Sequence, residues 1–286
     1  MKILIIGGAG QLGTDLVKVL STHDLVVPDH QTLDVVQLDQ IHQVLKSECP
    51  QIVINTAAFH RVDQCESEVN TSFQVNSEAI RNLALVAREI EAVLVHFSTD
   101  YVFDGQKTEP YSEEDQARPI NVYGVSKLAG EQLVESVWEK SFLIRTCGLY
   151  GHAGSRGKGS NFVETMVRKA QLGEAIRVVD DQRLTPTSTQ ELARKTASLI
   201  ETGHYGTYHI TSHGDCTWYE FAREIFSVLA VKVDLAAIAS DHFFSLARAR
   251  RPRYSVLAND RLEKLGMDDL KDWEEALRDY LGSRMT

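Results

Sequence analysis

The chain has 286 residues and a formal net charge of −10. A chain of this length can bury the core of one large domain or two smaller ones. Because phosphate-rich partners recruit basic surfaces, this acidic composition argues against nucleic acid and membrane surfaces as partners and favours small-molecule chemistry.

Cysteine and histidine usage predicts neither a disulfide framework nor a metal site. The four cysteines are widely spaced without a C-x-x-C pair, and the ten histidines show no H-E-x-x-H or clustered spacing. The N-terminus lacks a charged segment followed by a cleavable apolar run, and no apolar stretch is long enough to span a bilayer. We therefore expect a cytoplasmic protein.

A glycine-rich turn follows the first expected strand, residues 2–6, and precedes an amphipathic helix at 14–20. Glycines allow the backbone to approach a pyrophosphate, and a helix N-terminus supplies free N–H groups and the positive end of its dipole. The spacing is G-x-x-G-x-x-G rather than G-x-G-x-x-G, but its position predicts a dinucleotide site. The expected cofactor contacts are Gly7, Gly10, Gln11, Leu12 and Gly13.

The adenosine end of such a cofactor lies beyond the second strand, expected at 25–27. Asp29, His30 and Asp34 are the candidates there. An acidic residue bonds the ribose of NAD and a basic one accommodates the phosphate of NADP, so the choice between NADH and NADPH stays open. Two small residues after the third strand, Ala57 and Ala58, would let the cofactor press close.

Strands and helices alternate along the first half of the chain. We expect further strands at 51–55, 92–97 and 141–145 and helices at 37–46 and 70–90. This order predicts an α/β fold with a Rossmann-like, doubly wound parallel sheet.

The second half has a different composition and begins with a glycine-rich, basic stretch at 148–159. Helices are expected at 161–172, 189–200, 217–229 and 270–281, and strands at 176–180 and 206–211. We interpret residues 1–147 as the dinucleotide-binding domain. Residues 148–286 would form mainly a smaller, interleaved substrate-binding domain, with segments that return to the main sheet.

Polar residues at two places indicate chemistry. Ser98 and Thr99 end the fourth strand, where ligands of open α/β sheets bind, although their hydroxyls could also bond only local backbone. Tyr123 and Lys127 lie four residues apart, on one face of an expected helix. A nearby ammonium favours the phenolate and lowers the tyrosine pKa, so that the phenol could exchange a proton with a carbonyl or alcohol. Any surface helix can carry such a pair, however.

These motifs together resemble the dTDP-4-dehydrorhamnose reductase family of extended short-chain dehydrogenase/reductases. The resemblance covers essentially the whole chain and rests on STDYVFDG at 98–105, NVYG at 121–124, KLAGE at 127–131 and RRP at 250–252. It implies a reductase of a 4-keto nucleotide sugar that uses NADPH or NADH. In this family hydride passes to the sugar C4 carbonyl and Tyr123 would give the proton. Lys127 would bond the nicotinamide ribose, and Thr99 would bond the reacting oxygen or the tyrosine.

The resemblance also implies further contacts. Ser98, Tyr123 and Lys127 would touch the cofactor. The expected substrate contacts are Thr99, Tyr101, Phe103, Asn161, Phe162, Arg183 and Arg251. Asn161 could instead only cap its helix, and Arg251 could be a surface charge or salt-bridge partner. The oligomeric state, a homodimer included, stays open.

Related proteins supply the alternatives. Nucleotide-sugar dehydratases carry a glutamate where Tyr101 stands, which argues against dehydration. An epimerase of the same superfamily, or a regulatory subunit resembling the methionine adenosyltransferase β subunit, remains possible, but intact Thr99, Tyr123 and Lys127 favour an enzyme.

One position departs from the family pattern. Gly148 stands where the rhamnose-pathway reductases have a tryptophan that packs on the sugar. Unless Tyr101, Phe103 or Tyr150 fills the gap, we expect a preference for a different or bulkier 4-keto sugar. We also expect Gly148→Trp to improve the use of dTDP-4-dehydrorhamnose.

Overall fold

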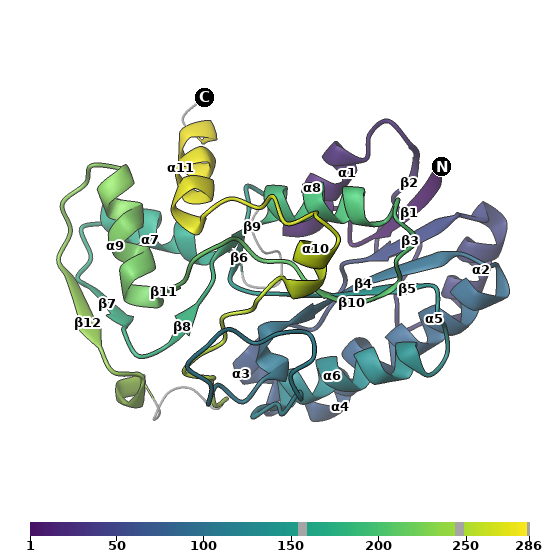
Figure 1. Cartoon of the computed structure of the whole chain (residues 1–286), viewed down its shortest axis with the longest axis horizontal. Coiled ribbons are helices and arrows are strands. Elements are labelled where there is room, and N and C mark those ends of the chain that lie inside the picture. The colour runs from purple at the N-terminus through teal and green to yellow at the C-terminus, as the bar shows by residue number, and fades with distance from the viewer. Residues whose placement is uncertain (154–158, 244–248, 285–286) are drawn as a thin grey trace.

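The computed structural model describes residues 1–153, 159–243 and 249–284, and its centre is a six-stranded parallel sheet (Figure 1). From one edge to the other the strands are β10 (Gly206–His209), β5 (Ser141–Thr146), β4 (Val93–Thr99), β3 (Ile52–Asn55), β1 (Lys2–Ile6) and β2 (Asp24–Val26). Every neighbouring pair is parallel. The expected Rossmann-like, doubly wound sheet is confirmed.

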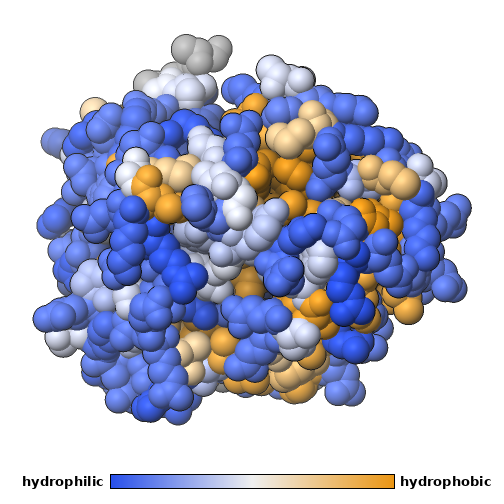
Figure 2. All heavy atoms as spheres, turned by 45° about the vertical axis from the view of Figure 1, so that its right-hand side comes forward, coloured by the Kyte–Doolittle hydropathy of each residue, from blue (hydrophilic) through white to orange (hydrophobic). Residues whose placement is uncertain are grey.

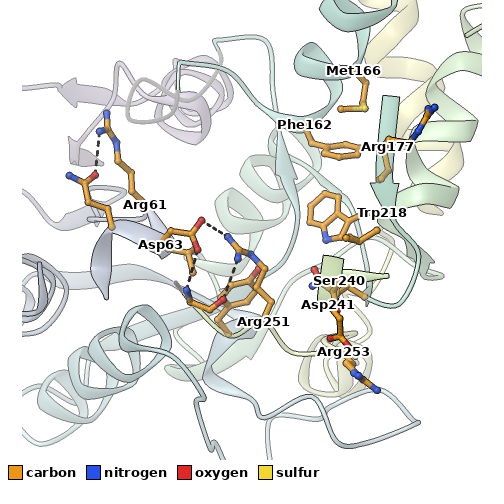
Figure 3. Close-up of a pocket in the computed structure, with 17 residues that line it drawn as sticks. Arg61, Asp63, Phe162, Met166, Arg177, Trp218, Ser240, Asp241, Arg251 and Arg253 are labelled. Atoms are coloured by element: carbon orange, nitrogen blue, oxygen red, sulfur yellow. Dashed lines mark hydrogen bonds and ion pairs between the residues drawn. The ribbon is translucent and has the colours of Figure 1, made fainter. Parts of the chain in front are cut away.

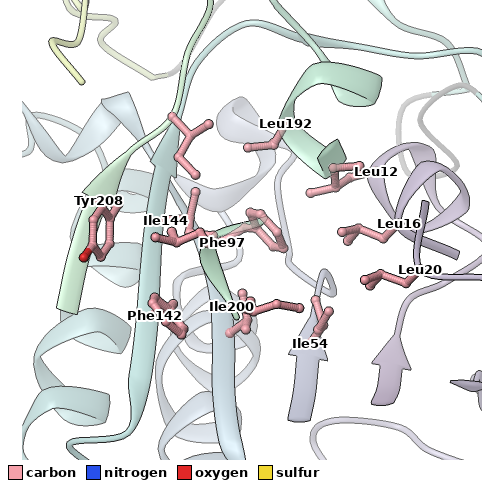
Figure 4. Packing of buried hydrophobic residues seen from close by; sticks show 14 of the residues in the cluster. Leu12, Leu16, Leu20, Ile54, Phe97, Phe142, Ile144, Leu192, Ile200 and Tyr208 are labelled. Carbon is pink, nitrogen blue, oxygen red and sulfur yellow. The ribbon is translucent and has the colours of Figure 1, made fainter. Parts of the chain in front are cut away.

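Helices cover both faces of this sheet (Figure 1). Helices α1 (Gln11–Val19) and α8 (Thr189–Leu199) cover one face, and α2 (Leu38–Glu48), α5 (Ala79–Glu89) and α6 (Val122–Glu135) cover the other. Because side chains alternate along a strand, Ile3 and Ile5 join the first core while Leu4 and Ile6 join the second. Figure 4 shows the first core, where Leu12 and Leu16 of α1 approach Leu192 of α8 and the sheet.

The helix expected at 70–90 is interrupted in the structure. It comprises α4 (Val69–Phe73), a π-helix (Gln74–Glu78) and α5. The π turn directs two polar side chains at α6: Asn76 Nδ2 donates to Ser126 Oγ at 3.0 Å, and Ser77 Oγ donates to the Ser126 carbonyl at 2.7 Å. A Cβ atom at Gly130 would overlap the Asn76 carbonyl, so the two helices pack in direct backbone contact.

The second half builds a smaller body around α7 (Phe162–Gln171), α9 (Trp218–Val228) and α11 (Trp273–Ser283), on the left of Figure 1. It contains three two-stranded pairs: β7 (Ile176–Val179) with β12 (Leu235–Ile238), β8 (Arg183–Leu184) with β11 (Cys216–Thr217), and β6 (Leu149–Tyr150) with β9 (Thr187–Ser188). Residues of the same half return to the main sheet as α8 and β10. The assignment of residues 1–147 to dinucleotide binding and of residues 148–286 mainly to substrate binding stays a prediction.

Several short elements were not expected from the sequence, namely the strands β6, β8, β9, β11 and β12 and the helices α3 (Val62–Cys65) and α10 (Asp260–Lys264). Part of the glycine-rich stretch at 148–159 lies outside the described residues. No helix in the described ranges is long and apolar enough to cross a bilayer. On the face in Figure 2, hydrophilic side chains cover most of the surface and hydrophobic ones show between them in patches.

Candidate active site

The glycine turn joins β1 to the N-terminus of α1. Gly7 has φ +77°, in the left-handed region that favours glycine, and its carbonyl accepts the Gly10 N–H at 2.8 Å. A Cβ atom at Gly13 would overlap the Gly7 carbonyl, so this glycine lets the helix start against the turn. At Gly10 a Cβ atom would meet only the Gly7 oxygen, at 3.1 Å, and would otherwise face open space. The turn therefore fits a group that approaches its backbone closely, as a pyrophosphate does.

Two other residues of the turn point elsewhere. Leu12 is buried in the core shared with α8, so only its backbone could meet a cofactor. Gln11 Nε2 donates to the Leu149 carbonyl at 3.2 Å, and Gln11 Oε1 accepts from Asn161 Nδ2 at 3.1 Å. Gln11 thus ties the turn to the second half of the chain.

The expected adenosine end is exposed. Asp29 Oδ1 accepts the Thr32 N–H at 2.8 Å, and this bond is the main cause of a lowered pKa of the Asp29 carboxyl. The His30 side chain is 81% exposed, with Nδ1 4.0 Å from Asp34 Oδ1. An acidic and a basic group therefore lie side by side, and the geometry does not choose between NADH and NADPH.

Two hydroxyls end β4 at the carboxyl edge of the sheet. Ser98 Oγ is buried and makes no hydrogen bond within the described part of the chain, so it is available to a ligand. Thr99 Oγ1 donates to Asp100 Oδ1 at 3.0 Å and accepts the Tyr101 N–H at 3.2 Å. Asp100 is buried, and burial raises the pKa of its carboxyl.

Tyr123 and Lys127 lie on α6, whose N-cap Asn121 accepts the Gly124 N–H at 2.8 Å. Burial raises the pKa of the Tyr123 phenol, while a hydrogen bond with the Thr99 side chain acts in the opposite direction. Burial is the largest influence on this pKa, and its lowering by Lys127 stays a prediction. Lys127 Nζ instead contacts His96 Nε2 at 2.9 Å and the Phe97 carbonyl at 2.6 Å. Burial lowers the Lys127 pKa to about 8.

A cavity of about 850 Å³ opens beside Tyr101, whose ring meets the Tyr123 ring edge-on at 5.9 Å. Figure 3 shows Met166, Phe162 and Trp218 on one wall with Arg177 beside them, and Arg61 and Arg251 across from that wall. The lining residues used below are Tyr101, Phe162, Met166, Trp218, Arg251 and Arg253. A hollow of this size, apolar with a few charged groups, suits an organic anion of moderate size.

The glycine turn follows β1 and Thr99 ends β4, so both lie at the carboxyl edge of the sheet, and Tyr101 connects Tyr123 to the cavity. A family model described as the RmlD substrate binding domain matches residues 1–285. The chain belongs to this family. The membership makes the protein an NAD(P)-dependent oxidoreductase.

Individual relatives of this RmlD-family protein agree with that class. A dTDP-4-keto-6-deoxy-D-glucose reductase from Streptomyces niveus is 37% identical, over 96% of this chain and 94% of the relative. A solved structure of a dTDP-4-dehydrorhamnose reductase ortholog from Clostridium acetobutylicum is 38% identical, covers 100% of both chains and superimposes with a TM-score of 0.95. The Bacillus anthracis dTDP-4-dehydrorhamnose reductase, solved in complex with NADP, is 38% identical, covers 99% of both chains and gives a TM-score of 0.93.

Three expected substrate contacts of the RmlD-family protein have other roles in the structure. Phe103 is fully buried and stacks on Tyr111 at 4.3 Å, so it belongs to the core and does not reach the cavity. Arg183 pairs with Asp215 and with Glu220, whose Oε2 lies 3.1 Å from Nη2, so its charge is already balanced. Asn161 caps α7 by accepting the Glu164 N–H, and its Nδ2 is bonded to Gln11 and Gly151.

The cavity also contains residues that sequence reasoning missed. Trp218 opens α9 directly after its N-cap, as Phe162 opens α7, and the two rings lie 4.7 Å apart. Arg253 follows Arg251 by two residues and also lines the cavity, but the chain bends at Arg253, so the spacing alone could not have placed its side chain. Arg251 pairs with Asp63 at 2.8 Å, whereas Arg253 makes no ion pair within the described ranges.

Proposed function

We propose that the protein reduces the C4 carbonyl of a 4-keto nucleotide sugar with NADPH or NADH, with Tyr123 as proton donor. The observation that carries this proposal is the place of Tyr123 on α6, where its ring meets Tyr101 of the cavity wall edge-on at 5.9 Å, with Thr99 close by at the end of β4. The names of two relatives support a dTDP-linked 4-keto sugar as the substrate class, because both relatives are named as reductases of such sugars.

The chain's own groups would divide the work as follows. When bound, the nicotinamide supplies the hydride. Thr99 would orient the phenol of Tyr123 toward the reacting oxygen, and the raised pKa keeps this phenol protonated until the more basic oxygen of the reduced carbonyl takes its proton. Lys127 provides a buried positive charge that stabilises the phenolate left behind. Gly7, Gly10 and the unpaired Ser98 hydroxyl would meet the cofactor.

The cavity would hold the nucleotide part of the substrate. Arg253, which has no ion-pair partner in the described ranges, would meet the diphosphate together with Arg251. The Phe162 and Trp218 rings, 4.7 Å apart and tilted by 48°, offer apolar faces on which the base could stack. Residues 148–286 would then act mainly as the substrate-binding part, since α7, α9 and the segment carrying both arginines lie there.

The cavity wall also bears on the effect of Gly148 on the choice of sugar. Phe103 and Tyr150 are fully buried, so of the three aromatics considered only Tyr101 lines the cavity. We propose that Tyr101 gives the aromatic contact to the sugar here, so that Gly148 by itself does not make dTDP-4-dehydrorhamnose a poor substrate.

The decisive experiment follows the absorbance of NADPH and NADH with a panel of 4-keto nucleotide sugars, including dTDP-4-dehydrorhamnose and dTDP-4-keto-6-deoxyglucose. We expect sugar-dependent oxidation of one reduced nicotinamide. An epimerase would convert sugars without net oxidation. A regulatory subunit would bind the dinucleotide yet turn over no sugar, and would instead change the rate of a partner synthetase.

A further inference from the structure

Behind Lys127 lies a row of three buried polar side chains, Asn55, His96 and Lys127, exposed by 0, 1 and 1%. Asn55 and His96 stand opposite each other in the β3–β4 register, and Lys127 reaches them from α6. Asn55 Nδ2 lies 3.1 Å from His96 Nδ1, and His96 Nε2 lies 2.9 Å from Lys127 Nζ. The role proposed for the lysine does not explain why a histidine should touch its amine.

Hydrogen counting restricts this row. Burial, the largest cause, holds the His96 pKa well below its ordinary value, and a charged Lys127 lowers it further, so the ring is neutral in both charge states of the lysine and has one donor and one acceptor nitrogen. Asn55 Oδ1 accepts the Ala57 N–H at 3.1 Å, which turns the amide nitrogen toward His96 and makes Nδ1 the acceptor. The hydrogen then sits on Nε2, facing Lys127. An ammonium cannot accept it, so this arrangement needs an uncharged amine.

A charged Lys127 needs the reverse arrangement. Its ammonium donates to Nε2, the ring hydrogen moves to Nδ1, and Asn55 must turn its oxygen to His96 and release the Ala57 N–H. The Phe97 carbonyl, 2.6 Å from Nζ, can accept in both states. The remaining charged group that acts on the lysine is Glu131 on α6, which raises its pKa against the lowering by burial.

We propose that His96 is a positioning residue that couples the charge of Lys127 to the Asn55–Ala57 turn at the end of β3. This inference rests on the proposed role of Lys127 and extends it. Ala57 and Ala58 are expected cofactor contacts, so any group that accepts the Ala57 N–H in place of Asn55 favours the charged lysine. Occupation of the dinucleotide site and the charge that stabilises the phenolate are thereby linked without a direct contact.

The direct test is nitrogen-15 NMR of histidine-labelled full-length protein without substrate, titrated from pH 6 to 10. We expect His96 to change from the Nδ1–H tautomer at low pH to the Nε2–H tautomer at high pH, with a midpoint near the Lys127 pKa of about 8. His96→Gln identifies the signal, and Lys127→Met should abolish the transition. A single tautomer throughout the titration, or a transition that persists in Lys127→Met, overturns the proposal.

Activity supplies an independent readout through the high-pH limb of kcat. Asn55→Asp presents only acceptor oxygens to Nδ1, so the ring hydrogen stays on Nδ1 and Nε2 accepts from a charged Lys127. The pKa of the high-pH limb should therefore move up by about one pH unit. His96→Leu removes the acceptor from Nζ and should move it down by a similar amount, whereas His96→Gln keeps an acceptor oxygen and should restore most of the shift. Equal limbs in Asn55→Asp and His96→Leu contradict the coupling. If the protein reduces no sugar, the NMR titration still decides this inference separately.

Discussion

At the scale of single residues, Gly10 separates cofactor binding from folding. Its backbone is extended, with φ −82° and ψ 177°, so other residues can adopt it, and a Cβ atom there faces open space apart from the Gly7 oxygen. We expect Gly10→Val to abolish NADPH and NADH binding because the side chain enters the pyrophosphate path. Calorimetry measures this, with the melting temperature as control. Unchanged dinucleotide affinity in the folded variant would disprove the role of the turn.

Tyr123→Phe removes one oxygen from the proposed proton donor. We expect kcat to fall by about 100-fold or more, the usual contribution of a positioned acid–base group, with dinucleotide affinity nearly intact. Tyr111→Phe is the matched control, because its hydroxyl bonds Asp104 at 2.8 Å within a separate core cluster. If both variants turn over sugar at similar rates, Tyr123 is a structural residue.

Two arginines, one that lines the cavity and one that does not, test whether the cavity binds the diphosphate. Arg253→Ala removes a cavity cation that has no ion-pair partner in the described ranges, and should weaken dTDP binding about tenfold or more, as expected for a charged hydrogen bond. Arg183→Ala removes a cation that Asp215 and Glu220 already balance, and should leave that affinity nearly unchanged. Calorimetric titration with dTDP measures both. The opposite ranking would return Arg183 to the substrate site.

At the scale of elements, the geometry of the turn between β5 and β6 argues against the expectation that Gly148→Trp improves catalysis. Gly148 has φ +57°, and a Cβ atom there would lie 2.9 Å from Leu184 Cδ1 and 3.1 Å from Pro186 Cα. A tryptophan would combine a strained backbone with crowding, so Gly148→Trp should lower the free energy of unfolding by about 2 kcal/mol or more, rather than improve catalysis. Urea denaturation measures this. Gly148→Asn, which tolerates positive φ better, should lose less.

Elements were predictable where one local signal decides them. The strands of the main sheet and most helices follow from apolar periodicity, because both sheet faces are buried. The π-helix at Gln74–Glu78 was not predictable, since its cause is the approach of α6 through Gly130, about fifty residues later. Short β12 was missed for the same reason: its pairing with β7 depends on the distant chain rather than on its own sequence.

The site was predictable where spacing along one element fixes it. Tyr123 and Lys127 share a helix, and Ser98 and Thr99 end a strand. Phe103 was assigned wrongly because its motif does not say which side of the chain faces the cavity, and the stacking with Tyr111 settles that only in three dimensions. The partners of Lys127 come from β4, so its contact with His96 could not be read from α6.

At the scale of the whole molecule, a buried histidine makes stability depend on pH. Burial, and then Arg145, lower the pKa of His209 to about 3 from its ordinary value of 6.5. Because the unfolded chain binds the proton first, the stabilisation is complete above pH 6.5 and is lost as the pH falls toward 3. Between pH 7 and pH 5 the free energy of unfolding should drop by about 2 kcal/mol through this residue.

Urea denaturation of His209→Gln provides the comparison. The variant starts less stable at pH 7, because His209 Nδ1 lies 3.1 Å from the Tyr111 carbonyl and 3.0 Å from the Ala258 carbonyl. Its further loss between pH 7 and pH 5 should be smaller than that of the native protein by the same 2 kcal/mol or so. Equal losses in both proteins would mean that His209 does not control the acid sensitivity.

The place of β10 in the sheet has a consequence for synthesis on the ribosome. β10 pairs with β5, yet it begins 60 residues after β5 ends, at Gly206 compared with Thr146. Until Gly206–His209 has left the exit tunnel, β5 presents an unpaired edge, and the sheet face beneath α8 is open to solvent. A nascent chain stalled before that point exposes a template for strand pairing with other chains. Chaperone protection is therefore needed most while residues 147–209 emerge from the exit tunnel.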